Sequence, residues 1–283
     1  MKLLPLLPAL LCITCAIPSS MTMKSMIPVL EEMELSVQSS NDLQTICDGL
    51  PSGMLLIEGI IRKLPDNRRA RLLAAKLYSG YALAFSEISD EDRAVSLYRT
   101  ARDHGLAVIS NGDIIRDGTF KQAEAAIQRI GKNETELLFW TAQAWAGIIR
   151  FGLNEPRNLA ALARVEAMMH QVMKHDPAYF HGGPTLFLGV LLGIKPPPAG
   201  GDLNRGIEII MDAYRLSGNH FLLAEYYRAD LIARVPGREE EAKDILRTLI
   251  GDDSPHPSEL TFLNTVAHRR AEHLLEQIYE EEP

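Results

Sequence analysis

The chain has few cysteines, the residues whose disulfide bonds stabilise many small secreted proteins. It contains three cysteines among 283 residues, and aromatic residues make up only 6%. Two of the cysteines, Cys12 and Cys15, lie close to the N-terminus, which leaves Cys47 alone in the rest of the chain. A framework of disulfide bonds is therefore excluded, and stability has to come from the burial of apolar side chains.

The chain also lacks an excess of positive charge, because acidic residues outnumber basic ones. The formal net charge is -8, so the chain lacks the broad positive surface that neutralises phosphates, and we expect no nucleic-acid partner. Hydrophobic residues make up 46% and charged residues 23%, which is ordinary for a globular protein that buries a full core.

Catalytic and metal-binding motifs are missing as well. The sequence contains no H-E-x-x-H, paired C-x-x-C, G-x-x-x-x-G-K-[ST], G-x-G-x-x-G or G-x-S-x-G motif. His170 and His175, like His268 and His273, are five residues apart, which turns them away from each other on a helix. We therefore expect no enzyme, no cofactor and no metal site. A helical hydrolase with dispersed catalytic residues is the alternative, but no nucleophile with a nearby base can be named.

The longest stretch without charge lies at the N-terminus. Lys2 precedes an uncharged run from Leu3 to Ser20, whose apolar part, Leu3 to Ile17, has the length of a signal-peptide core. A membrane-spanning helix needs about 20 apolar residues, and Pro5 and Pro8 would break a buried helix. We therefore predict a signal peptide over residues 1–20 and export from the cytoplasm.

Cys15 lies where the cysteine of a lipoprotein would carry its lipid. A strong lipobox has an apolar residue three positions earlier and a small one directly before the cysteine, whereas Cys12 and Thr14 stand there. Cleavage after Ala16, with Thr14 and Ala16 at the small-residue positions, is the alternative. Both options stay open, and a lipid on Cys15 would be the only attachment to a membrane.

Apolar residues beyond position 20 recur with helical spacing almost everywhere, and no run alternates as a strand does. The sequence predicts an all-α fold, with a loose segment over residues 21–45 and a single all-helical, repeat-like domain over residues 46–283. Glycine and proline mark the expected breaks between helices, at residues 65–67, 105, 118, 131, 152, 156, 177, 182–184, 196–201, 218–219, 236–237 and 255–257.

The best-formed helix is predicted from Glu134 to Phe151. Asn133, with Glu136 three residues later, has the pattern of a capping box, and Gly152 marks the end. The helix is apolar on all its faces, which is typical of a helix buried on every side. It is therefore expected at the centre of the domain.

The two tryptophans of this helix, Trp140 and Trp145, have two interpretations. They either fill the core, which we expect, or line a cavity. The run Tyr226-Tyr227-Arg228 also has two interpretations. It belongs to a half-buried amphipathic helix, which we favour, or it forms a contact surface.

Several predicted helices carry a small, a large and again a small or apolar residue at the spacing found in the second helix of tetratricopeptide repeats. The four triplets are Ala94, Tyr98 and Ala101; Gly206, Ile210 and Ala213; Ala242, Leu246 and Leu249; and Val165, Met169 and Val172. The pattern predicts a helical bundle or solenoid of degenerate tetratricopeptide-like helix pairs.

The segment from Tyr179 to Asp202 combines three features. His181-Gly182-Gly183-Pro184 predicts a helix-to-helix turn, and Gly189 and Gly193, four residues apart, predict close packing of another helix. Pro196 to Pro198 form an extended loop longer than the repeat requires. We predict that this segment shapes an opening that engages a ligand or partner, while a distorted repeat capped by the insertion is the alternative.

Five motifs follow one another along the chain: the run from Leu138 to Trp145, Asp176-Pro177-Ala178-Tyr179, Gly182-Gly183, Leu188-Gly189 and Gly200-Gly201-Asp202. Their order resembles that of a known family, the T components of TRAP-transporter-associated lipoproteins (TatT). The resemblance continues through Leu72 to Phe85 and Leu263 to Leu275, so it spans most of the mature chain.

The resemblance implies a helical bundle with cryptic tetratricopeptide repeats around a central pore. It also implies a periplasmic trimer that binds the solute-binding P component of a tripartite transporter and guides a small apolar or carboxylate ligand. The weak lipobox leaves the lipid anchor open, and the shortage of aromatics from Leu186 to Leu192 leaves the pore chemistry open. A protein-interaction scaffold unrelated to transport is the alternative. The candidate pore, ligand or partner residues are Trp140, Trp145, Tyr179, His181, Gly182, Gly183, Pro197 and Asp202.

Overall fold

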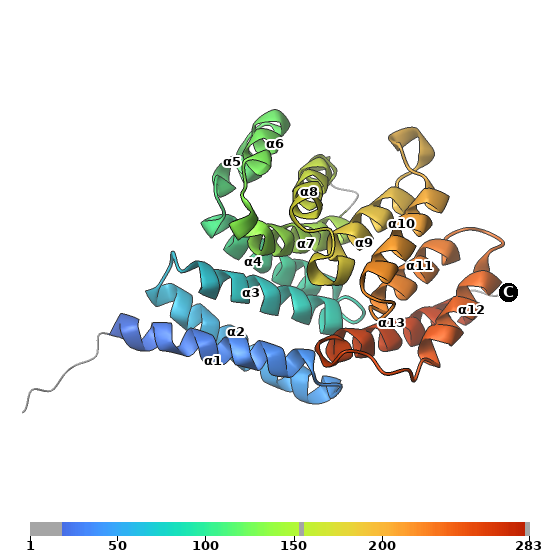
Figure 1. Cartoon of the computed structure of the whole chain (residues 1–283), viewed down its shortest axis with the longest axis horizontal. Helices are drawn as coiled ribbons and strands as arrows, with labels where there is room; N and C mark the ends of the chain where they lie inside the picture. The colour runs from blue at the N-terminus through green and yellow to red at the C-terminus, as the bar shows by residue number, and fades with distance from the viewer. Residues whose placement is uncertain (1–18, 153–155, 281–283) are drawn as a thin grey trace, which may run out of the picture.

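The computed structural model describes residues 19–152 and 156–280, and every regular element in these ranges is a helix (Figure 1). The predicted all-α fold is confirmed. Cys15 and nearly all of the predicted signal peptide lie outside the described residues. In the described ranges, no helix combines the length and the apolar character that crossing a membrane requires.

The first part of the chain packs each helix against its neighbours in sequence. Its helices are α1 (Ser19–Gln38), α2 (Leu43–Lys63), α3 (Arg68–Tyr81), α4 (Glu91–Val108), α5 (Gly112–Asp117), α6 (Phe120–Gln128), α7 (Thr135–Phe151) and α8 (Pro156–His175). A π-helical turn, η1 (Ala82–Ser86), leads from α3 towards α4, and a 3-10 turn, η2 (Lys132–Glu134), precedes α7. Helix α7 packs against α3, α4 and α8, which places it inside this part.

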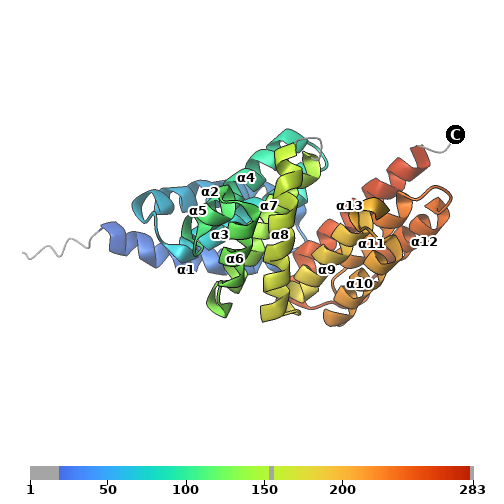
Figure 2. The same cartoon turned by 90° about the horizontal axis from the view of Figure 1, so that it is seen from above.

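The second part of the chain continues the same arrangement. It consists of α9 (Tyr179–Ile194), η3 (Pro197–Ala199), α10 (Leu203–Leu216), α11 (Leu223–Ala233), α12 (Glu239–Ile250), η4 (Ser258–Leu260) and α13 (Thr261–Glu280). Figure 2 shows the two parts following each other along the long axis of the molecule. The last helix returns to contact α1 and α2, so the beginning and the end of the chain pack together.

Two apolar clusters hold the fold together. One joins the first helices to the last and contains buried residues such as Leu30 and Leu263, while the other is centred on α7 and α8 around Leu138 and Met168. The ring of Phe180, at the start of α9, packs against both clusters. The turn that carries Phe180 therefore lies where the two parts meet.

The prediction of a loose segment over residues 21–45 is wrong, because most of these residues form helix α1. Helix α1 covers most of it, and Ile27 and Leu30 are buried against the cluster shared with α2 and α13, each only 3% exposed. Methionines supply much of the remaining apolar face, and Pro28 lies inside the helix. The helix was not predicted because a proline inside a helical pattern of apolar residues normally indicates a helix break.

The central helix is confirmed as α7, but its predicted capping box does not form. Glu134 precedes the helix, and its carboxylate accepts hydrogen bonds from the backbone N–H of Ser110 (3.0 Å) and from its hydroxyl (2.8 Å). Arg68 pairs with the same carboxylate at 2.6 Å. Asn133 lies within η2 and is not the cap. The start of α7 is therefore fixed by contacts with α3 and the end of α4, which the local sequence does not reveal.

Gly105 was expected to break a helix and instead lies inside α4. A Cβ atom at this position would stand 2.0 Å from the Thr141 Oγ1 atom of α7, so only glycine lets the two helices approach this closely. A Cβ atom on Gly147 of α7 would likewise stand 2.5 Å from the ring of Tyr98. These glycines mark the crossing of α4 and α7.

The close packing predicted at Gly189 and Gly193 is confirmed. A Cβ atom on Gly206 of α10 would lie 2.7 Å from the Gly189 carbonyl oxygen and 2.7 Å from the Gly193 nitrogen of α9. All four triplets of small and large residues are buried. Because Gly189, Gly193 and Gly206 have no side chains, the backbones of α9 and α10 lie nearly in contact.

Replacing Gly206 by Ala is expected to destabilise the protein by about 1–3 kcal/mol, because the new methyl group has to push the backbones of α9 and α10 apart. The matched control is Gly59→Ala in α2, where a Cβ atom would have nothing within 4 Å. That variant should be stabilised by roughly 0.5–1 kcal/mol, since alanine favours a helix interior. Urea unfolding of both variants measures the two changes, and equal changes of the same sign would contradict the packing argument.

Candidate functional site

Most of the candidate residues meet at the turn that opens α9. Phe180, His181 and Gly182 have φ values of 47°, 57° and 81°, so three successive residues adopt the left-handed conformation. The helix-to-helix turn predicted from His181 to Pro184 is therefore confirmed, and it begins one residue earlier. A Cβ atom on Gly182 would lie 2.9 Å from the Ala213 carbonyl oxygen of α10, which restricts that position to glycine.

Aromatic rings surround this turn and compensate for its strain. A left-handed conformation disfavours a residue other than glycine by roughly 1–2 kcal/mol. The centroid of the Phe180 ring lies 4.8 Å from Trp140, 5.4 Å from Phe139 and 6.2 Å from Phe221. Each such pair contributes about 0.5–1.5 kcal/mol beyond its buried area. Together with Tyr179, whose ring lies 5.1 Å from Phe139, these residues form what we call the aromatic cluster.

The polar side chains at the aromatic cluster are partly shielded from water, since Tyr179 and the neighbouring His181 are half-buried. Burial raises the pKa of the Tyr179 hydroxyl, and burial lowers the pKa of His181, so both side chains are uncharged at neutral pH. Trp140 is 9% exposed. The Trp140 side chain interacts with the Tyr179 hydroxyl and partly offsets the rise of its pKa, so the cluster offers an apolar, aromatic surface whose polar groups face each other.

Trp145 is not part of the aromatic cluster. It lies one turn further along α7, is 5% exposed, and packs under the Arg102 guanidinium at 5.5 Å from its ring centroid. Both tryptophans are thus shielded, as predicted for a helix apolar on all its faces. Trp145 therefore fills the core. Trp140 does so too, and it also contacts Phe180 of the strained turn.

Pro197 and Asp202 lie at the opposite end of α9 from the turn. The regular part of the helix, from residue 183 to Ile194, separates them from it by about 18 Å, at 1.5 Å per residue. Asp202 caps α10 by accepting a hydrogen bond from the Arg205 backbone N–H at 2.9 Å. The structure therefore does not bring the predicted segment together as one opening.

The proline loop is also more compact than predicted. Of the three prolines, Pro196 has extended backbone angles, whereas Pro197 and Pro198 lie in the 3-10 turn η3. The backbone N–H of Gly200 donates to the Pro197 carbonyl (3.0 Å), and that of Gly201 donates to the Pro196 carbonyl (3.2 Å). These hydrogen bonds close the loop, which overcomes the tendency of successive prolines to stay extended.

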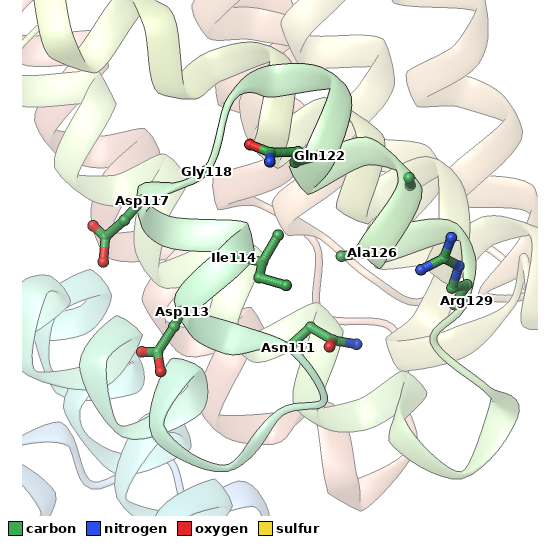
Figure 3. Close-up of a pocket in the computed structure, with 9 residues that line it drawn as sticks. Asn111, Asp113, Ile114, Asp117, Gly118, Gln122, Ala126 and Arg129 are labelled. Atoms are coloured by element: carbon green, nitrogen blue, oxygen red, sulfur yellow. The ribbon is translucent and has the colours of Figure 1, made fainter.

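Helix α6 is flanked by two shallow grooves. The larger, with a volume of about 530 Å³, lies between α5 and α6 and is lined by residues such as Asn111, Ile114 and Arg129 (Figure 3). The second, of about 430 Å³, lies between α6 and α8 and includes Phe120 and His170. Sequence reasoning identified neither groove, because each depends on how a short helix leans against its neighbours.

Sequence reasoning also missed a buried group of charges where α7, α11 and α13 meet. The Glu87 carboxylate, 4% exposed, pairs with Arg270 at 2.8 Å and with Arg150 at 3.3 Å. The Tyr98 hydroxyl donates a hydrogen bond to the same carboxylate at 2.6 Å. The only local signal was the run Tyr226-Tyr227-Arg228, whose Tyr226 ring lies 5.1 Å below the Arg270 guanidinium. Tyr226 is buried and Tyr227 half-buried, as favoured for an amphipathic helix.

Comparison with known proteins assigns the whole fold to one family. The family model described as the TRAP transporter T-component matches residues 39–280, from the end of α1 to the end of α13. No curated protein matches the chain. The matched range contains the aromatic cluster, the glycine crossing of α9 and α10 and the buried charges. The family is one of accessory transporter components and is not a class of enzyme. The chain therefore belongs to the family of TRAP transporter T components.

Proposed function

We propose that this T component is a periplasmic protein that binds the solute-binding P component of its transporter. The observation that carries the proposal is the family match, because it extends over residues 39–280 and so covers nearly every described helix. Such a component acts by holding a partner in place. The degenerate helix pairs act as tetratricopeptide-like repeats, which present extended surfaces to proteins.

The face that contacts the P component is the one from which α5, α6 and the loop between α9 and α10 project. In Figure 1 these segments rise on the same side of the molecule. Three apolar side chains are exposed on them: Ile114 (44%), Phe120 (43%) and Ile194 (48%). Exposed apolar residues beside shallow grooves are typical of protein-interaction surfaces. We call Ile114, Phe120, Ile194 and the loop over residues 195–202 the partner face.

The aromatic cluster serves the ligand. It lies at the junction of the two parts of the chain, and its strained turn and aromatic rings suit a site that contacts a small apolar or carboxylate molecule passing through a pore. In this proposal the protein assembles as a trimer, and a lipid on Cys15, if the signal peptide is processed there, keeps it at the membrane.

Loosening the proline loop tests the partner face. Replacing Pro196, Pro197 and Pro198 by Gly and Ser removes a rigid turn without touching a buried side chain, since all three prolines are exposed. We expect the affinity for the P component of the same transporter to fall about tenfold or more, because a flexible loop has to be ordered on binding. Calorimetry with the two purified proteins measures this change.

The matched control is Pro236→Ser, in the exposed turn between α11 and α12. Both variants should keep the melting temperature within a few degrees, and only the loop variant should lose affinity. Unchanged affinity of the loop variant would remove the loop from the partner face. No binding of the unmodified protein to the P component would overturn the proposal as a whole.

A further inference from the structure

Two histidines from loops far apart in the sequence face each other in the second part of the chain. His220 lies in the loop between α10 and α11, and His256 lies in the loop between α12 and η4, 36 residues later. Their Nδ1 atoms are 3.2 Å apart, and the two rings stand nearly perpendicular, at 86°. No local spacing rule relates residues this far apart, which is why the sequence did not indicate a site here.

The His256 ring is oriented so that one of its nitrogens can act as a ligand. Its Nε2 atom faces the Asp252 carboxylate and the Ser254 hydroxyl, each at 3.4 Å. A carboxylate only accepts hydrogen bonds, so it favours the tautomer that carries the proton on Nε2. The Nδ1 lone pair of His256 is therefore directed at His220. A carboxylate behind an imidazole is the usual way in which proteins orient a histidine that binds a metal ion.

His220 is held in place through its backbone. Its N–H donates to the Ser217 Oγ atom at 3.2 Å, and its carbonyl oxygen accepts from the Asn264 Nδ2 atom at 2.9 Å. Asn264, in α13, is only 5% exposed, and its side-chain oxygen accepts the N–H of Leu222 at 3.1 Å. Helix α13 therefore fixes the loop that presents His220, and the two imidazoles are brought together by contacts other than their own.

We propose that His220 and His256 bind a zinc ion through their Nδ1 atoms. Two nitrogens at about 2.0–2.1 Å from a tetrahedral zinc ion are roughly 3.3 Å apart, close to the 3.2 Å observed. The His220 Nδ1–H donates to His256 in the structure. When His220 carries its proton on Nε2 instead, a small rotation of the rings lets the zinc ion take the place of the shared proton.

The surroundings of the pair favour a cation. The loop over residues 251–257 contains Asp252 and Asp253 and no lysine or arginine, so its charge attracts zinc. In the part of the chain that the structure describes, no third His, Cys, Asp or Glu side chain completes a larger ligand group, and water fills the remaining positions of the metal. Imidazole nitrogens suit zinc better than magnesium or calcium, which prefer oxygen ligands.

Zinc binding links these two loops to the aromatic cluster. Phe221 follows His220 directly, and its ring centroid lies 5.8 Å from that of His181 and 6.2 Å from that of Phe180. A metal ion between the loops thus stabilises one side of the left-handed turn. The site uses none of the residues of the partner face, so it is tested on this protein alone and does not depend on the P component.

Zinc binding to the full-length protein without an affinity tag tests the site. Calorimetry should show a single zinc site per chain, and zinc at about a hundredfold excess over its Kd should raise the melting temperature by roughly 5 °C. Asp252→Asn should weaken zinc binding about 10- to 100-fold, the usual effect of losing the partner that orients a ligand. His220→Ala and His256→Ala should each weaken it by at least about as much, because each removes a ligand.

His170→Ala is the matched control, since His170 is an exposed histidine on α8. It should leave the zinc affinity unchanged. Unchanged affinity in the variants of His220 and His256, or an equal loss in His170→Ala, would overturn the proposal. Failure of the unmodified protein to bind zinc would show that the two imidazoles share only a hydrogen bond. Circular dichroism checks that each variant keeps its helices, and Asp252→Asn decides the matter if a histidine variant unfolds.

Discussion

Replacing Glu87 by Gln is expected to destabilise the protein by about 3–5 kcal/mol, which is the usual effect of removing one partner of a buried ion pair. The variant keeps the volume of the side chain and an oxygen that accepts the Tyr98 hydrogen bond. Among the residues that the structure describes, it removes the one carboxylate that pairs with Arg150 and with the almost fully buried Arg270. The free energy of unfolding in urea, measured for the full-length protein, gives the change.

Two controls separate this charge effect from a general loss of packing. Asp113→Asn removes an acid whose side chain is 90% exposed and paired with Arg116, and it should change stability little. The double variant Glu87→Gln with Arg270→Met should recover much of the lost stability, because the almost fully buried guanidinium is removed and Arg150, whose side chain is 36% exposed, reaches solvent. A single variant as stable as the parent would show that the arginines are already compensated by another group.

Replacing Trp140 by Ala is expected to destabilise the protein by about 3–5 kcal/mol, the range for removing a large buried aromatic side chain. The indole contacts Phe180 at 4.8 Å and Phe139 at 5.4 Å between ring centroids. Its loss leaves a cavity and also removes support from the left-handed turn. Trp145→Ala should have a similar effect on stability, since Trp145 is equally shielded.

Trp140→Phe is the informative control for this position. It keeps an aromatic ring at this position and leaves a smaller cavity than alanine does, so the loss of stability should be clearly smaller than for Trp140→Ala. Thermal and urea unfolding measure both substitutions. If Trp140→Ala melted like the parent but bound ligand or partner more weakly, the residue would line an open pore instead of filling the core.

Local sequence patterns predicted the helices well because helix formation depends on neighbouring residues. Asp42, Asn67, Asp90, Thr119 and Asp202 each cap the helix that follows, and the breaks at Gly118, Gly131 and Gly152 are found in the structure. The apolar period along residues 134–151 also predicted the most buried helix.

The candidate site was predictable only in part. The Gly-Gly-Pro motif indicated a turn, but the left-handed angles of Phe180 and His181 were not predictable, because neither residue favours them. They persist because the ring of Trp140 in α7 and the ring of Phe221, two residues before α11, hold the turn in place. Similarly, Gly105 was taken as a break because the helix that crosses it cannot be seen locally.

The sequence by itself determined the helical class, most helix ends, the burial of α7 and the family, since all of these depend on short-range spacing and on the order of motifs. Only the tertiary structure decided that residues 19–38 form a docked helix, that Glu134 anchors the start of α7 and that Glu87 meets two arginines. The Leu83 carbonyl and Arg270, which share a hydrogen bond, are 187 residues apart. No local pattern encodes such a contact, because the geometry of all the intervening helices brings the two groups together.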